Sequence, residues 1–583
     1  MRPLDRPFGL VAAFLAAAAL ALGPTAPALA QRAPAGAPSA GPKSAVLPRA
    51  LVSAANPLAA EAGLKVLRAG GGAVDAAVAI QAVLGLVEPQ SSGLGGGAFM
   101  VYYDAQTRTV TAYDGRETAP AAAGPDLFLG EDGRPLPRGQ AVLSGRSTGV
   151  PGAVAMLGLA HKDQGRLPWS SLFGEAERLA TEGFAVPRRL AANINSARGT
   201  SNTPDTAAYF TKPDGTRYQA GETLKNPAYA QTLRALAARG PAALLTGPIA
   251  EAIVAKTREA PLPGAMTLAD LAGYEARKTP ALCRPYRAYT ICTPQLPSGG
   301  AAVQMVMGVL AATDIDTRGP QDPKAWLQFA EASRLAYADR NQYLGDPAFA
   351  AVPLEGLLDP AYLAGRGRTI GETAAPTVAH GRPAGAVALG PDRTEETAGT
   401  SNFAVVDETG DVLAMTTTVE GPLGSGRMVG GFILNNQLTD FSFSPATPDG
   451  APAANAVAGG KRPRSSMSPT IVLDRDGRFV MTVGSPGGNS IIAYVAKSLV
   501  GYLDWKLPLP AAIDLPNMVA SGTRPTVGVE STFDPAVAAA LAARGLTLSL
   551  GQGEESGLHG AARVEDGYEG AADERREGIV VGY

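Results

Sequence analysis

The sequence has few of the residues that most often bind metals or act as general bases. Histidine occurs three times in 583 residues, at His161, His380 and His559, which are far apart along the chain. A histidine-rich metal site is therefore not expected, and a Ser-His-Asp triad would have to use one of these three side chains. We predict no metal and no cofactor, and any hydrolytic chemistry must find its base elsewhere.

Cysteine is also scarce. The chain has two, Cys283 and Cys292, with eight residues between them. A turn in this stretch would bring the two thiols together across a hairpin, where an oxidising compartment permits a disulfide. Two buried, reduced thiols are the alternative. Neither cysteine has the surroundings of a catalytic nucleophile.

No long block of like charge occurs. Lys and Arg total 50 against 53 for Asp and Glu, which gives a net charge of −3. This balance argues against an extended surface for nucleic acid or for an anionic membrane. A hydrophobic content of 45% with 18% charged residues is typical of a soluble globular protein. The length allows three or four domains, or one large enzyme unit.

Only the N-terminus carries a long apolar run. Two arginines near the start precede the apolar residues 8–23, and Ala28-Leu29-Ala30 fits a cleavage site. This pattern predicts an export signal over residues 1–30. A membrane anchor is the alternative, but the run is shorter than the usual ~20 residues. Residues 31–47, rich in Ala, Pro and Gly, are predicted to be a flexible mature N-terminus.

The sequence pattern of the rest of the chain changes near residue 400, from mainly helical to mainly strand-like. Helical periodicity covers residues 57–68 and 73–87, and helices broken by Pro and Gly continue to about residue 350. Later, residues 403–419 and 471–483 form two strand–turn–strand patterns with the same Asp-x-x-Gly turn. The glycines of 93–97 lack the Lys-Ser/Thr of a phosphate loop, so we interpret them as tight backbone packing. A layered α/β architecture follows, with a boundary near 399/400.

Thr400 begins one of these strands directly after a glycine, and a series of motifs surrounds it in order. The motifs are Gly71–Ala77, Gly93–Gly97, Arg116–Pro120, Pro297–Gly300, Ala336–Arg340, Asn435–Gln437 with Asp440-Phe441, Lys461–Thr470 and Gly484–Gly488. On these residues the chain, from about Ser53 to Tyr583, resembles the γ-glutamyltranspeptidase family of N-terminal-nucleophile hydrolases. The resemblance implies a four-layer αββα sandwich in which a helix-rich N-terminal part and a β-rich C-terminal part share one core.

Members of this family cut their own precursor before the nucleophile. Here the resemblance implies cleavage between Gly399 and Thr400, giving a large subunit of residues 48–399 and a small catalytic subunit of 400–583 that stay together as a heterodimer. Cleavage would free the Thr400 α-amine, whose reference pKa of ~7.7–8.0 suits a base at neutral pH. Nucleophile and base would then belong to one residue.

The resemblance also assigns roles to the remaining site residues. It implies that Thr418 supports the nucleophile and that the backbone N–H groups of Gly487 and Gly488 form the oxyanion hole. The α-carboxylate of a donor would bind residues on one side of the site, and the α-ammonium of the donor would bind residues on the other side. The carboxylate group comprises Arg116, Ser465 and Ser466, and the ammonium group Glu420, Gln437 and Asp440.

The chain departs from the family pattern in three places. Asn402 replaces a common His, Asp573–Arg576 replaces an Asp-Pro-Arg, and the Ala/Pro-rich stretch 442–460 stands where some members have a lid. None of these is a first-choice catalytic position, so we still expect activity.

The leading hypothesis is a periplasmic or secreted γ-glutamyltransferase/glutathione hydrolase. It would act on glutathione and other γ-glutamyl compounds and pass the glutamyl group to water, an amino acid or a dipeptide. The first alternative is a related acylase for glutaryl or cephalosporin-type side chains, for which Glu420 and Asp440 would have no ammonium partner. The second is a catalytically silent exported homologue that binds γ-glutamyl peptides or a partner. No nucleic acid, and no membrane after signal removal, is expected as a partner.

Overall fold

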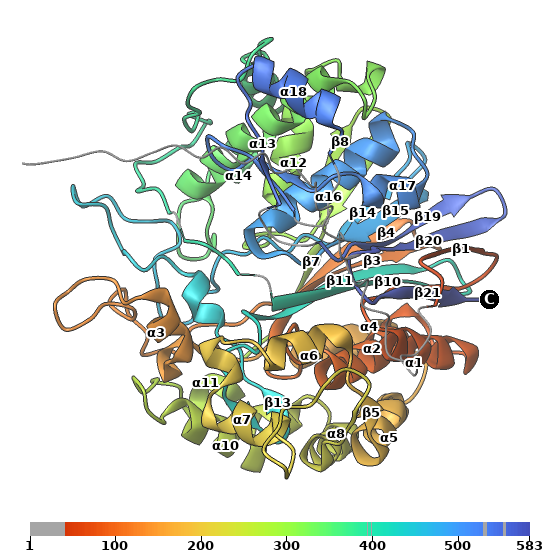
Figure 1. Cartoon of the computed structure of the whole chain (residues 1–583), viewed down its shortest axis with the longest axis vertical. Coiled ribbons are helices and arrows are strands. Elements are labelled where there is room, and N and C mark those ends of the chain that lie inside the picture. Colours follow the sequence, from red (N-terminus) through yellow and green to blue (C-terminus); the bar gives the residue numbers. More distant parts are fainter. Residues whose placement is uncertain (1–40, 393, 398, 529–532, 552–555) are drawn as a thin grey trace, which may run out of the picture. The chain divides into compact units, whose positions relative to one another are not determined.

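Two antiparallel, seven-stranded sheets form the centre of the chain (Figure 1). Sheet I has the order β21 (Ile579–Gly582), β2 (Leu51–Ala54), β10 (Gly399–Val406), β11 (Val412–Glu420), β3 (Gly97–Asp104), β4 (Thr109–Gly115) and β7 (Arg277–Pro280). Sheet II has the order β1 (Ser44–Leu47), β20 (Gly567–Ala572), β19 (His559–Val564), β15 (Phe479–Gly484), β14 (Thr470–Leu473), β9 (Tyr289–Thr293) and β8 (Leu282–Tyr286).

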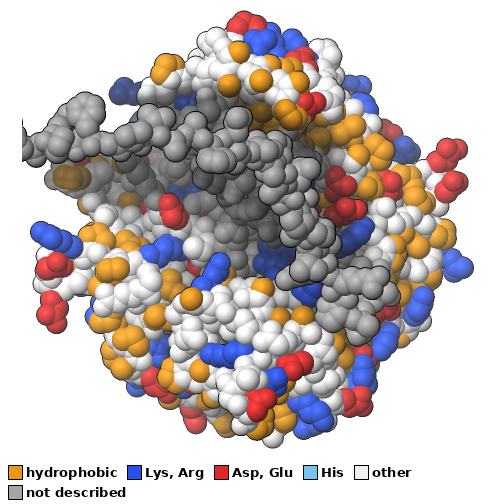
Figure 2. Space-filling view, viewed as in Figure 1, with side chains coloured by type: hydrophobic (Ala, Val, Ile, Leu, Met, Phe, Trp, Pro, Cys, Tyr) orange, Lys and Arg blue, Asp and Glu red, His pale blue; other side chains and the backbone are white. Residues whose placement is uncertain are grey.

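This computed structural model describes residues 41–392, 394–397, 399–528, 533–551 and 556–583, which belong to one compact unit. The predicted export signal, and residues 31–40 of the predicted flexible segment, lie outside the described residues. Among the described helices none is long and apolar enough to cross a membrane. On the face shown in Figure 2, basic and acidic side chains are interspersed and do not gather by sign.

The inner faces of the two sheets pack on each other, and helices cover both outer faces (Figure 1). On β10, Val406 joins the apolar cluster between the sheets, whereas Phe403 and Val405 face the helices beyond sheet I. Both faces of this strand are buried, as its continuous apolar run requires. The predicted four-layer αββα sandwich is therefore confirmed.

Helices of the N-terminal part cover sheet I. Helices α1 (Pro57–Arg68), α2 (Ala73–Val87) and α4 (Ala153–Gln164) pack on its strands, and α5 (Gly174–Glu182) and α8 (Pro227–Arg239) lie behind α2. Sheet II is covered by α12 (Gly300–Leu310), α13 (Pro323–Tyr343) and α16 (Ile491–Leu499). The other helices are α3 (Arg138–Leu143), α6 (Arg188–Ile194), α7 (Pro204–Phe210), α9 (Ala242–Leu245), α10 (Pro248–Thr257), α11 (Leu268–Ala272), α14 (Leu354–Leu357), α15 (Pro360–Gly367), α17 (Leu509–Asp514) and α18 (Pro535–Ala543). Short strands form three minor sheets: β5 (Phe184–Ala185) with β6 (Thr223–Leu224), β12 (Met428–Val429) with β13 (Phe432–Ile433), and β16 (Met518–Val519), β17 (Thr526–Val527) and β18 (Ser549–Leu550).

Local sequence signals account for several of these boundaries. The Asn56 side chain caps α1 by accepting from the Leu58 N–H, and Pro57 occupies the first helical turn. Helix α2 is buried over its whole length, which explains its apolar residues all round. The predicted helices 57–68 and 73–87 and both predicted hairpins are confirmed.

The two predicted subunits are interleaved in both sheets. Sheet I alternates strands from before residue 399 with β10, β11 and β21 from after it. One part of the N-terminal prediction is wrong, because residues 44–47 of the segment expected to be flexible form the edge strand β1. This strand pairs with β20, and the neighbouring Lys43 Nζ donates to the Gly578 carbonyl at 2.7 Å. Backbone pairing across the sheet, which composition does not reveal, orders this stretch.

Cys283 and Cys292 lie opposite each other on the hairpin β8–β9 and form a disulfide. The bond ties the edge strand β8 to its neighbour β9 and lies outside the lining of the catalytic cavity described below.

Candidate active site

The candidate nucleophile lies at the open end of the hairpin β10–β11. Gly399 pairs with Glu420, but Thr400 pairs with Thr418, so a bulge interrupts the register between Gly399 and Thr400. Such a bulge redirects the side chains on either side of it. Thr400 and Thr418 are both buried, and their hydroxyl groups point toward each other at 3.1 Å.

One hydroxyl connects the nucleophile to the bond that is expected to break. Thr418 Oγ1 accepts from Thr400 Oγ1 and also from the Glu420 N–H at 2.8 Å. The same hydroxyl donates to the Gly399 carbonyl oxygen at 2.7 Å. Thr418 is thus placed to take a proton from Thr400 and to polarise the Gly399 carbonyl, the two actions that an attack on this carbonyl needs.

Arg576 fixes the other side of the nucleophile. Its Nη1 donates to the Thr400 carbonyl oxygen at 3.0 Å, and its Nε donates to the Ser556 carbonyl. The strand β10 is therefore held at Thr400 by a residue near the C-terminus, which orients the threonine for chemistry.

Glycines let the backbone approach closely around this site. A Cβ on Gly399 would lie 2.5 Å from the Glu420 carbonyl oxygen, and one on Gly96 would lie 1.9 Å from that of Thr418. Real side chains do not tolerate such distances, so both positions need glycine. The interpretation of residues 93–97 as tight packing, without a phosphate, agrees with this geometry.

The predicted oxyanion glycines precede helix α16. Gly487 and Gly488 have φ of 133° and 53°, and Gly488 lines the cavity beside Thr400. In this uncut chain, the N–H of the next residue, Asn489, donates to the Glu396 carbonyl oxygen at 3.3 Å. A backbone carbonyl therefore lies against the turn whose N–H groups are predicted to bind an oxyanion.

Arg116 is buried and largely engaged within the protein. Its Nη2 donates to Asp440 Oδ2 and to the Arg464 carbonyl, both at 2.7 Å, and its Nε donates to the Pro463 carbonyl. Nη1 lies 3.9 Å from Glu117. Burial raises the pKa of Glu117 to about 8 despite the nearby Arg116, so this acid is mostly neutral at pH 7. Asp440, at 2.7 Å against 3.9 Å for Glu117, is the nearer counter-ion of Arg116.

Asp440 also accepts from Gln437 Nε2 at 2.5 Å. Burial first, and then the negative charges of Glu420 and Glu396, raise the pKa of the Asp440 carboxyl, whereas Arg116 opposes the rise. Two of the three residues predicted to bind an ammonium, Gln437 and Asp440, therefore lie together, and Asp440 contacts the arginine predicted to bind the carboxylate.

Glu420 is the last residue of β11 and its carboxylate is fully engaged. Oε1 accepts from Arg138 Nη2 at 2.9 Å and from the Thr397 N–H and hydroxyl at 3.0 and 2.8 Å. Asn436 Nδ2 donates to Oε2. A cation of the protein, Arg138, thus already partners the acid that was predicted to receive a substrate ammonium.

The two predicted serines differ in their surroundings. Ser465 lines the cavity, and its Oγ accepts from the Met467 N–H at 3.1 Å. Ser466 Oγ accepts from Arg340 Nη2 at 2.8 Å, and the Ser466 N–H donates to Glu396 Oε2 at 2.8 Å. Ser466 therefore already contacts a carboxylate, which comes from the chain itself.

A cavity of about 10 Å³ joins these groups, little more than the volume needed for one water molecule. Two of its lining residues, Glu396 and Thr397, belong to the segment before the predicted cleavage point, residues 394–397, which we call the strap. The cavity brings together most of the predicted site residues, and Gly399, Ser466 and Gly487 lie just outside its lining. The full lining is Arg116, Glu396, Thr397, Thr400, Thr418, Glu420, Gln437, Asp440, Ser465, Met467, Gly488 and Ile491.

Sequence reasoning missed four residues of this site: Arg138, Arg340, Glu396 and Arg576. Arg340 lies in the motif 336–340, which carried the family resemblance without a role for its arginine. Arg576 lies in the departure from the Asp-Pro-Arg pattern, a signal that was noted and given no function. Nothing in the sequence pointed to Arg138 or Glu396.

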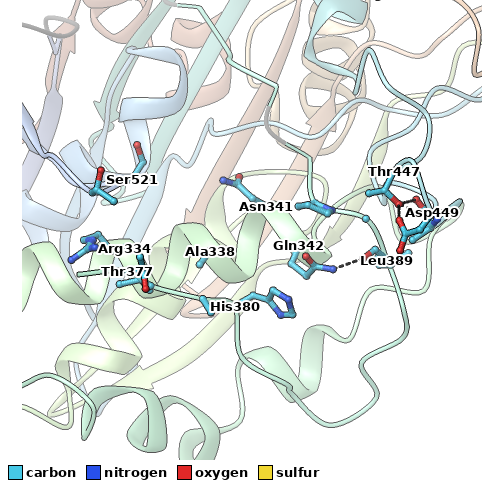
Figure 3. A pocket seen from close by; sticks show the side chains of 17 residues that line it. Arg334, Ala338, Asn341, Gln342, Thr377, His380, Leu389, Thr447, Asp449 and Ser521 are labelled. Atoms are coloured by element: carbon cyan, nitrogen blue, oxygen red, sulfur yellow. Dashed lines mark hydrogen bonds between the residues drawn. The ribbon is translucent and has the colours of Figure 1, made fainter. Parts of the chain in front are cut away.

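The three histidines do not line this cavity. His559 is buried on β19, and burial lowers its pKa to about 3, so its ring is neutral at ordinary pH. His380 lines a separate cavity of about 690 Å³ beside α13, together with Asn341 and Gln342 (Figure 3). The described residues contain no cluster of His, Cys, Asp and Glu placed to hold a metal ion.

Known proteins share this fold and sequence. The chain is 35% identical over 481 residues to the glutathione hydrolase proenzyme of Bacillus subtilis (strain 168), covering 80% of each chain. It is 33% identical over 543 residues to that of Escherichia coli (strain K12), covering 91% of this chain and 92% of the relative.

Two solved structures extend the comparison. The cephalosporin acylase of Bacillus halodurans matches with a TM-score of 0.82 at 24% identity, covers 97% of this chain and 99% of its own, and so supports the fold alone. The γ-glutamyltranspeptidase of Helicobacter pylori matches with a TM-score of 0.53 at 34% identity, over 55% of this chain and 92% of its own. A sequence model described as gamma-glutamyltranspeptidase matches residues 59–583. The chain therefore belongs to the γ-glutamyltranspeptidase family.

Proposed function

We propose that this protein is an exported γ-glutamyltransferase/glutathione hydrolase whose nucleophile is Thr400. Relatives at 33–35% identity carry the name glutathione hydrolase proenzyme and cover most of the chain, which supports the reaction class. The apolar N-terminal segment with its small-residue cleavage pattern supports export to the periplasm or the medium.

The first reaction is self-cleavage. Thr400 Oγ1 attacks the Gly399 carbonyl carbon as its proton passes to Thr418 Oγ1, and the Thr418 proton passes to the carbonyl oxygen. The C–N bond then breaks as the proton on the former carbonyl oxygen passes to the departing nitrogen, and an ester joins Gly399 to the Thr400 hydroxyl oxygen. Water hydrolyses this ester, which leaves a carboxylate on Gly399 and a free amine on Thr400.

The second reaction is acyl transfer. The Thr400 amine takes the proton from its own hydroxyl, which attacks the γ-carbonyl of the donor. The N–H groups of Gly487 and Gly488 stabilise the oxyanion, and the protonated amine passes its proton to the departing amine. Water, an amino acid or a dipeptide then takes the glutamyl group from Thr400.

Donor recognition uses charges of both signs. Arg116, Ser465 and Ser466 bind the α-carboxylate, because a buried guanidinium and hydroxyl groups suit an anion. The donor's α-ammonium binds on the side of Glu420, Gln437 and Asp440. In the uncut chain these opposite charges satisfy one another, with Arg116 and Asp440 2.7 Å apart, so a zwitterionic donor can replace contacts of both signs.

Cleavage would leave two polypeptides that form one heterodimer. Strands from both sides of residue 399 contribute to both sheets, so separating the two polypeptides would expose the core. A stable pair of chains is the expected product.

The bridge from Thr400 through Thr418 to the Gly399 carbonyl is the observation that carries this proposal. Its test is purification of the protein, separation of its chains under denaturing conditions and sequencing of the smaller chain, which should begin at Thr400. Thr400→Ala should stay uncut and inactive. Thr418→Val, which keeps the shape of the side chain, should slow cleavage about 10²–10⁴-fold.

Thr417→Val is the matched control, since the Thr417 hydroxyl donates to the Gly97 carbonyl on a neighbouring strand. It should be cut at the normal rate. An active, purified protein that remains a single uncut chain contradicts the proposal.

A second candidate, a glutaryl acylase, is favoured by one observation. Arg138 already partners Glu420 and Arg116 already partners Asp440, so both acids have cations without a substrate ammonium. Release of p-nitroaniline from γ-glutamyl and glutaryl anilides, with and without glycylglycine, separates the candidates. Preference for γ-glutamyl with stimulation by the dipeptide supports the transferase, and preference for glutaryl supports the acylase.

A further inference from the structure

We propose that Arg340, together with Ser466, forms the second half of the donor's α-carboxylate subsite, and that Glu396 fills this half until cleavage releases the strap. The inference rests on the proposed function and adds Arg340, on helix α13, to the residues that select the donor. The ligand class is a substrate carboxylate.

A carboxylate already lies in this place. Glu396 accepts from Arg340 Nη2 with one oxygen and from the Ser466 N–H, at 2.8 Å, with the other. Arg340 Nη2 also donates to Ser466 Oγ at 2.8 Å, so arginine and serine form one rigid clamp. Arg340 and Ser466 are each only 1% exposed, and the Glu396 side chain lines the catalytic cavity.

The clamp favours the charged form of its guest. Burial acts to raise the pKa of Glu396, but the Arg340 and Arg464 guanidinium groups and a hydrogen bond with Ser466 together hold it below its ordinary value. The site is thus built to bind an anion away from water, which is what the α-carboxylate of a donor requires.

Arg116 alone is poorly placed to supply the whole subsite. Its Nε and Nη2 are used by the Pro463 and Arg464 carbonyls and by Asp440, which leaves Nη1 beside Glu117. A bidentate grip on a substrate carboxylate would need further donors. Arg340 and the Ser466 N–H both bind Glu396, which lines the cavity, and would supply these donors once Glu396 has left.

The strap has to leave before a donor can bind. The cavity of about 10 Å³ cannot hold a glutamyl group, and Glu396 and Thr397 form part of its wall. Cleavage after Gly399 makes the strap the end of a chain, free of the covalent bond that holds it next to Thr400. Its departure opens the space in front of the nucleophile.

That departure leaves Arg340 without a counter-ion. Among the residues that the structure describes, Glu396 is the only acid that forms an ion pair with Arg340, and the Arg340 Nε has no hydrogen-bond partner among them. A buried guanidinium with no anion is strongly unfavourable. The mature site should therefore attract a carboxylate, and the donor brings one.

The test uses the mature, cleaved protein and two donors that differ only in the α-carboxylate. These are γ-L-glutamyl-p-nitroanilide and 4-aminobutanoyl-p-nitroanilide, which retains the ammonium and the scissile amide. Arg340→Met should lower kcat/KM for the glutamyl donor about 10–100-fold, mainly through KM, as expected for loss of a hydrogen bond to a charged group. For the decarboxylated donor the change should stay below about 3-fold, because no carboxylate contact is lost.

Arg334→Met is the matched control, since Arg334 is a buried arginine of the same helix that pairs with Glu331 and lies outside the catalytic cavity. It should leave the ratio of the two donors unchanged. If the Arg340→Met protein is not cleaved, Arg340→Lys is measured in the same way, because lysine keeps the positive charge but lacks the planar, forked guanidinium group. The glutamyl donor alone should again be affected.

The outcomes separate this inference from the proposed function. An equal loss for both donors, or no loss for either, overturns the role of Arg340 while leaving the transferase intact. If the wild-type mature protein does not turn over the γ-glutamyl anilide at all, the proposed function itself fails.

Discussion

The two hairpins β10–β11 and β14–β15 are built on the same turn and serve different ends. In each, the N–H of the turn glycine donates to the carbonyl of the first aspartate, Gly410 to Asp407 and Gly477 to Asp474. Both glycines have positive φ, 82° and 74°. The turn sequence therefore fixes the hairpin in both sheets.

The difference lies at the open ends. The hairpin β10–β11 opens onto Thr400 and Thr418, whereas β15 leads into Gly487 and Gly488. These ends meet across the sandwich, since a Cβ on Gly484 would lie 2.2 Å from Asn402 Oδ1. One hairpin thus supplies the predicted nucleophile and the other leads to the predicted oxyanion donors. The turn sequence thus determines the shape of each hairpin, and the position of the hairpin in the sandwich determines the chemistry to which it contributes.

The largest effect is expected when a side chain is added at Gly399, at the open end of the hairpin β10–β11. Gly399→Ala would place a Cβ 2.4 Å from the Gly421 carbonyl group and so should displace the bond to be cut. Self-cleavage should fall below detection on denaturing gels. Gly410→Ala, in the turn of the same hairpin, places a side chain at a positive φ and should still be cut. Normal cleavage of Gly399→Ala would contradict the role given to this open end.

A side chain added after the hairpin β14–β15, at its open end, should lower turnover. Gly488→Ala disturbs an N–H predicted to bind the oxyanion and should lower kcat of the cleaved protein on the γ-glutamyl anilide about 10²–10³-fold. Gly477→Ala is the control, because its φ is also positive but it lies in the turn. Equal kcat losses in the two variants would mean that backbone strain, and not the oxyanion, explains the effect.

A smaller effect is expected on selectivity. Glu420→Gln removes the charge at the end of β11 and should lower the preference for γ-glutamyl over glutaryl anilide about 10–100-fold, by loss of a charged contact with the ammonium. Glu408→Gln, in the exposed turn, should leave this ratio unchanged. An unchanged ratio in Glu420→Gln would mean that Arg138 alone is its partner.

The preference for the γ-glutamyl over the glutaryl anilide should also depend on pH. Burial and Glu420 raise the pKa of Asp440, so its negative charge is lost at a higher pH than that of an ordinary aspartate. As the pH falls through this pKa, binding of an ammonium should weaken, while glutaryl, which has none, should be spared. The ratio of kcat/KM for the two donors should therefore fall with falling pH, and the shared titration of the Thr400 amine cancels.

The smallest effects are expected at the turns. Asp407 is buried and accepts from the Ala73 N–H at 2.9 Å as well as from N–H groups of its own turn. Within the described part of the chain, the hydrogen bonds that Asp474 accepts all come from its own turn. In the uncut Thr400→Ala background, Asp407→Ala should cost about 1–3 kcal/mol and Asp474→Ala about 0.5–1.5 kcal/mol. Denaturant unfolding measures both, and equal losses would remove the distinction between the two turns.

Much of the fold could be predicted from local pattern. Helices 57–68 and 73–87 follow from periodicity, a capping Asn56 and a Gly stop, and both hairpins follow from alternating strands around an Asp-x-x-Gly turn. The family motifs also indicated which residues meet at Thr400. The edge strand at 44–47 could not be predicted, because composition says nothing of the partner strand that orders it.

The sequence by itself determined the family, the layered fold and the residues expected to do the chemistry, because these depend on motifs and on periodicity along the chain. Only the tertiary structure decided which charges neutralise one another in the site. The pairs Arg138–Glu420, Arg340–Glu396 and Arg116–Asp440 join residues 282, 56 and 324 positions apart. Such contacts arise when the two sheets close on each other, since burial then forces each charge to find whichever partner the fold brings near.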